Sequence, residues 1–316
     1  MRRPNLFLIG APKSGTTSLY EYLRGHPDVF MSPMKEPFYF APDVVTGPRR
    51  RQLRYQADEQ AYLELFAAAG DERWVGEAST GYMVSRRAAS LVKEFDPAAR
   101  ILAMVRNPVA VVHALHGERQ SHRVEDIADF GQALDADEDR RAGRRLPVGS
   151  TPLGATYVDT GHFGEQLTRW FDEFGREHVH VIVFDDFATD TAASFEGVLR
   201  FLEIDTTYRP SSFGIHNPSH QMRGGLAGGL RKSRVGRGLR RLGTLLMGEG
   251  RATRLAREVR HSRLTRSRSG REPLSPALRR RLEKEFALDV ELLGEAIGRD
   301  LTGLWFGGPS AHNRSP

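Results

Sequence analysis

Short apolar runs alternate with amphipathic stretches along most of the chain. Continuous apolar runs at 6–9, 100–105 and 178–184 have the length and composition of buried strands, and a shorter strand is expected at 73–77. Stretches with apolar positions along one helical side lie between and after them, at residues 16–23, 58–69, 88–95, 109–120, 161–174 and 192–202. Strands that alternate with helices predict the α/β class, with a central parallel sheet flanked by helices on both faces.

Charge and composition divide the chain into unequal parts. The net charge is +6, but 15 lysines and arginines against two acids fall between Arg223 and Arg271, so the remainder is acidic. An amphipathic helix with a proline in its first turn follows this basic stretch. We therefore predict a core at 1–220, a basic Gly/Arg-rich lid or surface segment at 221–271, a C-terminal helix packed on the core at 272–307 and a disordered tail at 308–316.

Composition narrows the class of protein. The chain has no cysteine, which excludes disulfides and thiolate chemistry. No apolar run approaches the ~20 residues of a membrane span. The first apolar run is too short for a signal peptide and lacks a small-residue cleavage site. We expect a cytoplasmic protein, and the Arg- and Ala-rich residue usage indicates a bacterial source.

The segment from Asn5 to Tyr20 has the features of an anion site. It reads NLFLIGAPKSGTTSLY, which predicts a strand, a turn with two glycines and a helix N-terminus. The first N–H groups of a helix lack partners and its dipole is positive there, so an anion binds readily. Lys13 adds a charge and four Ser and Thr hydroxyls add donors. Serines and threonines that only cap the helix are the structural alternative.

The same loop differs from the nucleotide-binding Walker A pattern at one position. Gly10 is followed by four residues and then Gly15-Thr16-Thr17, so Thr16 stands where Walker A has lysine. The only lysine of the loop, Lys13, lies inside the turn. This placement suits a 5′-phosphate and a leaving-group oxygen better than a β/γ-phosphate pair with Mg²⁺.

The run from Pro12 to Leu19 resembles the 5′-phosphosulfate loop of sulfotransferases that use 3′-phosphoadenosine 5′-phosphosulfate (PAPS). The resemblance covers about residues 5–205. It implies a P-loop-like α/β fold, PAPS as donor, 3′-phosphoadenosine 5′-phosphate (PAP) as product and no required metal. The acceptor would be a hydroxyl group of a sugar, a lipid or a small natural product. The chain resembles the heparan/Golgi-type branch of the family more closely than the cytosolic small-molecule branch. Golgi members carry an N-terminal membrane anchor, which we do not expect here.

The resemblance assigns the donor-binding residues. Lys13 would stabilise the leaving oxygen, and the 5′-phosphate would be held by Ser14, Gly15, Thr16, Thr17 and Ser18. Arg106 ends a buried strand and resembles the first residue of the family's 3′-phosphate segment; a guanidinium suits phosphate oxygens, although a salt-bridged structural arginine is the alternative. The family's serine eight residues later is Ala114 here, so this contact is missing or supplied by another residue such as His113. Arg223, in a Gly-rich loop, could reach the 3′-phosphate.

Two glutamates are candidates for the general base. Glu36, in Lys35-Glu36-Pro37, matches the position of the catalytic glutamate in heparan-type and protein-tyrosine sulfotransferases, and nearby aromatic burial would raise its pKa. A solvated Lys35/Glu36 surface pair is the alternative. Glu77 is the second candidate, with Ala78 where heparan-type members have lysine.

Three further residues are candidates for the acceptor pocket: Phe38, Tyr82 and His113. Core packing is an equal alternative for Tyr82. A lone histidine on a helix is more often structural than catalytic, which applies to His113.

Two other functions compete with sulfuryl transfer. A P-loop nucleotide kinase is disfavoured by Thr16 at the Walker lysine position. A non-catalytic protein that binds anions or membranes would use the basic segment, where arginines and leucines alternate at 231–260. That segment fits an anionic membrane surface, an acidic substrate or a solvated helix pair. Its few aromatics argue against nucleic acid. The acceptor and the oligomeric state stay open.

Overall fold

The computed structural model describes residues 2–44, 58–147, 150–214 and 273–307, and the backbone of two short pairs at 221–222 and 266–267. Contacts divide the chain into two compact units, Met1–His216 with Leu274–Pro316, and Asn217–Pro273. In the second unit the described pairs form strands β6 (Gln221–Met222) and β7 (Arg266–Ser267), which run antiparallel. The rest of the predicted lid, Arg223 and residues 231–260 included, and the predicted tail lie outside the described residues.

A five-stranded parallel sheet forms the centre of the first unit, with strand order β2-β3-β1-β4-β5. The strands are β1 (Leu6–Gly10), β2 (Val29–Met31), β3 (Trp74–Ala78), β4 (Arg100–Val105) and β5 (Val179–Val183). Strand β1 is central: Leu6 pairs with Gly76 of β3 on one side and with Arg100 of β4 on the other. The chain runs from β1 to β2 and β3 on one side and then crosses to β4 and β5 on the other. Ligands in such folds bind at this switch point, outside the carboxyl ends of the central strands.

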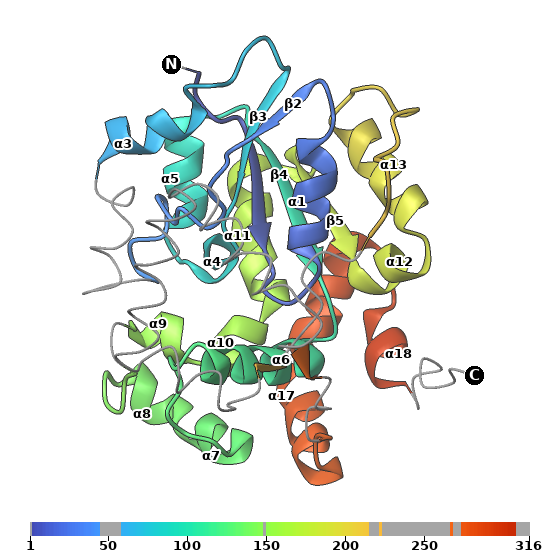
Figure 1. Cartoon of the computed structure of the whole chain (residues 1–316). Helices are drawn as coiled ribbons and strands as arrows, with labels where there is room; N and C mark the ends of the chain where they lie inside the picture. The colour runs from blue at the N-terminus through green and yellow to red at the C-terminus, as the bar shows by residue number, and fades with distance from the viewer. Residues whose placement is uncertain are drawn as a thin grey trace. The chain divides into compact units, whose positions relative to one another are not determined.

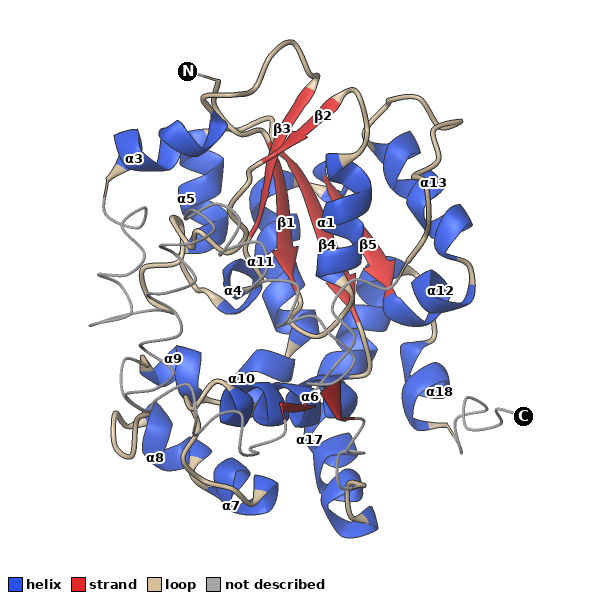
Figure 2. Ribbon diagram, viewed as in Figure 1, coloured by secondary structure: helices blue, strands red, loops and turns tan. Residues whose placement is uncertain are grey.

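Side chains of β1 alternate between two apolar layers. Leu6 and Leu8 face helices α1 (Thr16–Arg24), α12 (Phe184–Thr189) and α13 (Thr191–Phe201). Phe7 and Ile9 face the opposite layer. That layer contains α4 (Gly81–Val84), α5 (Ala88–Phe95), α6 (Pro108–Ser121), α11 (Phe163–Phe174) and α17 (Pro276–Ile297). Figure 2 shows the strands between these helices. The predicted α/β fold with helices on both faces is confirmed.

Short elements complete the first unit. They are α3 (Glu59–Leu63), the 3-10 turns Glu64–Phe66 and Arg176–His178, α7 (Phe130–Asp135), α8 (Asp137–Arg141), α9 (Pro152–Ala155), α10 (Val158–Gly161) and α18 (Leu301–Phe306). Helix α7 begins at Phe130, where the Asp129 carboxylate caps it by accepting the Gln132 N–H at 2.8 Å. None of the helices in the described ranges is long and apolar enough to cross a membrane.

The C-terminal helices return to the sheet next to β4. The Asp289 carboxylate of α17 accepts the N–H groups of Gly164 and Glu165, at 2.8 and 2.9 Å, at the start of α11. In α18 the Trp305 carbonyl accepts Asn107 Nδ2 at 3.0 Å. Asn107 also caps α6, accepting the Val109 N–H. The C-terminus therefore holds the turn that follows β4.

Candidate active site

The loop after β1 is shaped by two residues with left-handed backbone. Gly15, with φ 92°, precedes α1, and a side chain there would press against Met104 and the Phe184 ring. Lys13, with φ 61°, takes the same conformation without being glycine. Between them Ser14 is fully buried. The turn directs the first N–H groups of α1, those of Thr16 and Thr17, into the loop, where they have no acceptor within the helix. An anion cradle results.

Two cations predicted from the sequence meet at this loop. The Arg106 Nη1 donates to the Lys13 carbonyl at 3.2 Å, and its guanidinium lies 4.4 Å from the centroid of the Phe184 ring. The Lys13 Nζ donates to Glu118 Oε1 of α6 at 3.1 Å. Lys13 is one-fifth exposed and Glu118 somewhat more. The structure thus places Arg106 beside Lys13 and adds a carboxylate that the sequence did not indicate.

A third cation, Lys35, was missed by the sequence reasoning. Its Nζ donates to Thr16 Oγ1 at 3.3 Å and Thr17 Oγ1 at 3.2 Å, both in the first turn of α1. It also donates to Glu36 Oε1 at 3.4 Å. The available signal was its position beside Glu36, in an elbow that follows strand β2. Lys35 therefore connects the phosphate cradle with the predicted base.

Glu36 lies on this elbow with left-handed backbone, φ 64°. Its N–H donates to the Ala78 carbonyl at 2.8 Å, and its carboxylate accepts the Thr80 N–H at 2.9 Å. Burial raises the pKa of the Glu36 carboxyl, while the Lys35 ammonium and the Thr80 donors act to lower it. A half-buried carboxyl with a raised pKa, beside the anion cradle, has the properties of a general base.

Glu77 lies at the end of β3 and is completely buried. It accepts the hydroxyls of Tyr82 at 2.5 Å and Tyr62 at 2.9 Å on one oxygen, and that of Ser79 at 2.7 Å on the other. Burial, with a smaller contribution from the nearby Glu36 charge, raises its pKa to about 7 against these three donors. Glu77 holds the turn that supplies Thr80 to Glu36, and its side-chain hydrogen bonds to described residues go to Tyr62, Tyr82 and Ser79, outside the cradle.

The candidate acceptor residues fall in different places. Tyr82 is completely buried, with its hydroxyl on Glu77 and the Phe40 N–H, which corresponds to the core-packing alternative. Phe38 is partly buried beside Gly81, and its N–H donates to Ser79 Oγ at 3.2 Å. His113 is partly buried on α6, with its ring 5.2 Å from the Phe130 ring. The neighbouring Ala114 is buried.

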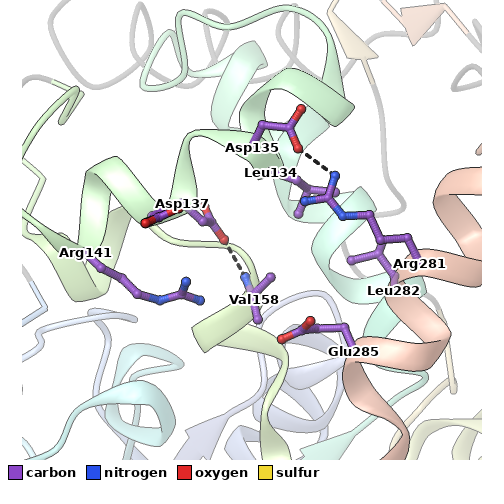
Figure 3. Close-up of a pocket in the computed structure, with 9 residues that line it drawn as sticks. Leu134, Asp135, Asp137, Arg141, Val158, Arg281, Leu282 and Glu285 are labelled. Atoms are coloured by element: carbon purple, nitrogen blue, oxygen red, sulfur yellow. Dashed lines mark hydrogen bonds and ion pairs between the residues drawn. The ribbon is translucent and has the colours of Figure 1, made fainter.

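A cavity of about 330 Å³ lies elsewhere, among α7, α8, α10 and α17. It is lined by Leu134, Asp135, Asp137, Glu138, Arg141, Val158, Arg281, Leu282 and Glu285. Figure 3 shows two of its carboxylates bonded within the protein: Asp135 to Arg281, at 2.6 Å, and Asp137 to the Val158 N–H, at 2.8 Å. It shares no residue with the cradle. Among the described residues, no group of three or more histidines and carboxylates could hold a metal ion.

Known proteins are similar to this chain over the same region. The family model described as Sulfotransferase domain matches residues 3–217. The human carbohydrate sulfotransferase 15 is 25% identical over 245 residues, which cover 64% of this chain and 44% of that protein. The human heparan sulfate glucosamine 3-O-sulfotransferase 6 is 24% identical over 207 residues, 64% of this chain and 53% of that protein. The chain thus spans about half the length of the curated relatives it matches.

A solved structure is similar over nearly the whole chain. The sulfotransferase from Alicyclobacillus acidocaldarius superposes with a TM-score of 0.70 and is 29% identical in sequence. The match covers 96% of this chain and 99% of that one.

Proposed function

The chain belongs to the sulfotransferase family, as the loop from Pro12 to Leu19 predicted, and we propose that it transfers a sulfuryl group from PAPS to an acceptor hydroxyl group. The convergence of Lys13, Lys35, Arg106 and Glu36 at the carboxyl ends of the strands supports this reaction. The two named relatives act, by their names, on carbohydrate and heparan sulfate. A carbohydrate hydroxyl is therefore the first acceptor class to test.

The residues of the cradle fit the donor. The N–H groups and hydroxyls of Thr16 and Thr17 can hold a 5′-phosphate, with Lys13 at the oxygen that leaves. Arg106, next to Lys13, offers a forked donor to the 3′-phosphate. Ala114 has no polar side chain, so the 3′-phosphate would rely on Arg106 more heavily here than in members with the serine.

The chemistry assigned to the protein is a proton transfer and the stabilisation of charge. The acceptor oxygen forms a bond to sulfur while the bond from sulfur to the 5′-phosphate oxygen breaks. Glu36 takes the acceptor proton, and Lys13 stabilises the charge that develops on the phosphate oxygen. The products are a sulfate ester, PAP and protonated Glu36, which returns its proton to water.

The variant Glu36→Gln tests the role of the base. We expect turnover to fall by about 10²–10⁴-fold while PAP affinity is retained, because the amide keeps the Thr80 contact but cannot take a proton. The measurement is transfer from ³⁵S-labelled PAPS to whichever member of a panel of sugars, lipids and phenols the wild type sulfates. The matched control, Glu291→Gln at an exposed position of α17, should keep full turnover. Unchanged turnover in Glu36→Gln would transfer the role of base to Glu77 or a histidine.

A further inference from the structure

The Lys35 ammonium occupies a position between two functional groups. It lies 3.2–3.4 Å from three oxygens: those of Thr16 and Thr17 on α1 and one of Glu36. The farther threonine, Thr16, lies 19 positions before Lys35 in the sequence. Lys35 keeps one-fifth of its exposure, so the group is partly shielded from water. A solvated surface pair of Lys35 and Glu36 would not explain the two threonine contacts.

The backbone of the elbow holds Lys35 in this position. The Glu36 N–H is bonded to the Ala78 carbonyl of β3, and the left-handed φ of 64° at Glu36 turns the chain there. Such a conformation is unfavourable in a residue other than glycine and persists only where surrounding contacts enforce it. The elbow is thus fixed to the sheet and not to the threonines alone.

The direction of the hydrogen bonds has a consequence for the threonines. An ammonium can only donate, so Thr16 Oγ1 and Thr17 Oγ1 act as acceptors toward Lys35. A hydroxyl that accepts in this way keeps its own proton for another partner. Lys35 therefore prepares both hydroxyls as donors, which is the form that a phosphate oxygen requires.

We propose that Lys35 is a second cation, beside Lys13, for the 5′-phosphosulfate group of the donor, and that it is shared with the Glu36 carboxylate. The proposal rests on the proposed function, and it adds a binding residue that also adjusts the base. A charge at this position, next to the Thr16 and Thr17 hydroxyls, adds to the neutralisation of the phosphate by the N–H groups of α1. It also keeps Glu36 ionised, so that Glu36 can accept a proton.

The charged groups around Glu36 determine how its pKa should respond to the loss of Lys35. Lys35 faces it from the elbow and lowers its pKa, as the Thr80 donors do, and Glu77 of β3 is the nearby carboxyl whose own pKa the Glu36 charge raises. Loss of Lys35 leaves burial of Glu36 opposed by the neutral Thr80 donors alone. The pKa of Glu36 then rises, and the carboxyl becomes protonated at a higher pH than in the wild type.

The contact of Lys35 with the 5′-phosphate is tested by measuring the binding of two nucleotides in the absence of any acceptor. PAP and adenosine 3′-phosphate differ only in the 5′-phosphate, so the ratio of their dissociation constants isolates that group. In calorimetry, Lys35→Met should weaken PAP by about 10- to 100-fold and leave adenosine 3′-phosphate unchanged, because a charge-assisted contact is lost. Lys35→Arg should restore most of the PAP affinity. The control Lys284→Met, on an exposed position of α17, should bind both nucleotides as the wild type does.

The outcomes separate this inference from the proposed function. A wild-type protein that fails to bind PAP contradicts the proposed function. Wild-type PAP binding that is unchanged in Lys35→Met contradicts the role of Lys35 alone, as does an equal loss for both nucleotides in a folded variant. Should the methionine variant not fold, Lys35→Gln is measured in the same way.

Titration of the Glu36 carboxyl tests the second part. In protein labelled with ¹³C at glutamate carboxyls, and with Glu36→Gln to assign the signal, the Glu36 midpoint should move to higher pH in Lys35→Met and not in Lys284→Met. An unchanged midpoint would contradict the shared role.

Discussion

Two glutamates in this protein, Glu77 and Glu125, are buried and bonded to tyrosine hydroxyls, but of the two only Glu125 is also bonded to an arginine. Glu77, under the elbow, is bonded to Tyr62, Tyr82 and Ser79, and no cation contacts it among the described residues. Glu125, in the segment that follows α6, accepts hydrogen bonds from the Tyr157 hydroxyl at 2.7 Å and from Arg140 Nη2 at 2.8 Å.

The cation decides the ionisation of each glutamate. Burial raises the pKa of Glu77 to about 7 in spite of its three hydroxyl donors. At Glu125 burial acts in the same direction, but the Arg140 guanidinium, Tyr157 and the Ile127 N–H lower the pKa to about 2. At Glu77 three hydroxyl donors do not offset burial, whereas at Glu125 the guanidinium together with Tyr157 and the Ile127 N–H more than offsets it. Glu125 and Arg140 form a permanent structural pair, and Glu77 exchanges its proton near neutral pH.

Glu36, close to Glu77, does have a cation beside it. The Lys35 ammonium contacts both Glu36 and Thr17 of the cradle, so this positive charge lies where the donor would bind. The contacts there are longer, 3.2–3.4 Å, and partly exposed, whereas the Arg140–Glu125 pair is fully enclosed. Lys35 can therefore exchange its present partners for a bound donor, whereas the enclosed Arg140–Glu125 pair has no room to exchange partners.

Removal of the Arg140 cation should have the largest effect on stability. In Arg140→Met, Glu125 is left buried without its partner, and we expect a loss of about 3–5 kcal/mol in the free energy of unfolding. Urea unfolding at neutral pH measures it. The exposed pair of Arg281 with Asp135 provides the control, since Arg281→Met should cost about 0–1 kcal/mol. Equal small losses in both variants would show that the buried pair is not structural.

The pH dependence of stability should distinguish Glu77 from Glu125. Because the folded pKa of Glu77 is raised from 4.5 to about 7, the folded state binds more protons than the unfolded state between these values. Its contribution to the free energy of unfolding is therefore complete at low pH and falls as the pH rises through that window, by about 3 kcal/mol.

The variant Glu77→Gln should remove this decrease. Urea unfolding of wild type and variant over a pH series gives the difference between the two curves. That difference should change between about pH 4.5 and 7 and be flat above it. A difference that does not vary with pH would contradict a raised pKa for Glu77.

The sequence predicted the parts of the molecule that depend on local pattern. The apolar run at 100–105 is strand β4 with the same bounds, and Pro108 begins α6 behind the Asn107 cap. The start of α7 was not indicated by apolar pattern, because side-chain contacts set it: Asp129 caps the helix at Gln132, and the Ile127 N–H before it donates to Glu125. Helical periodicity alone does not show which side chains accept these N–H groups.

The site was predictable where strand ends carry polar residues, as at Lys13, Glu36 and Arg106. The contacts that join them were not. Lys13 meets Glu118 across 105 positions, and Lys35 reaches α1 only because the backbone turns at Glu36. Tyr82 was open to two interpretations because the sequence does not show that its buried hydroxyl is bonded to Glu77.

Calorimetric titration of the full chain with PAP and, separately, with Mg-ATP tests the central claim most directly. A cradle with Thr16 at the Walker lysine position, and with Lys13, Lys35 and Arg106 around it, predicts micromolar binding of PAP and no binding of Mg-ATP. Binding of Mg-ATP, or of neither nucleotide, would contradict the assignment of the cradle to PAPS.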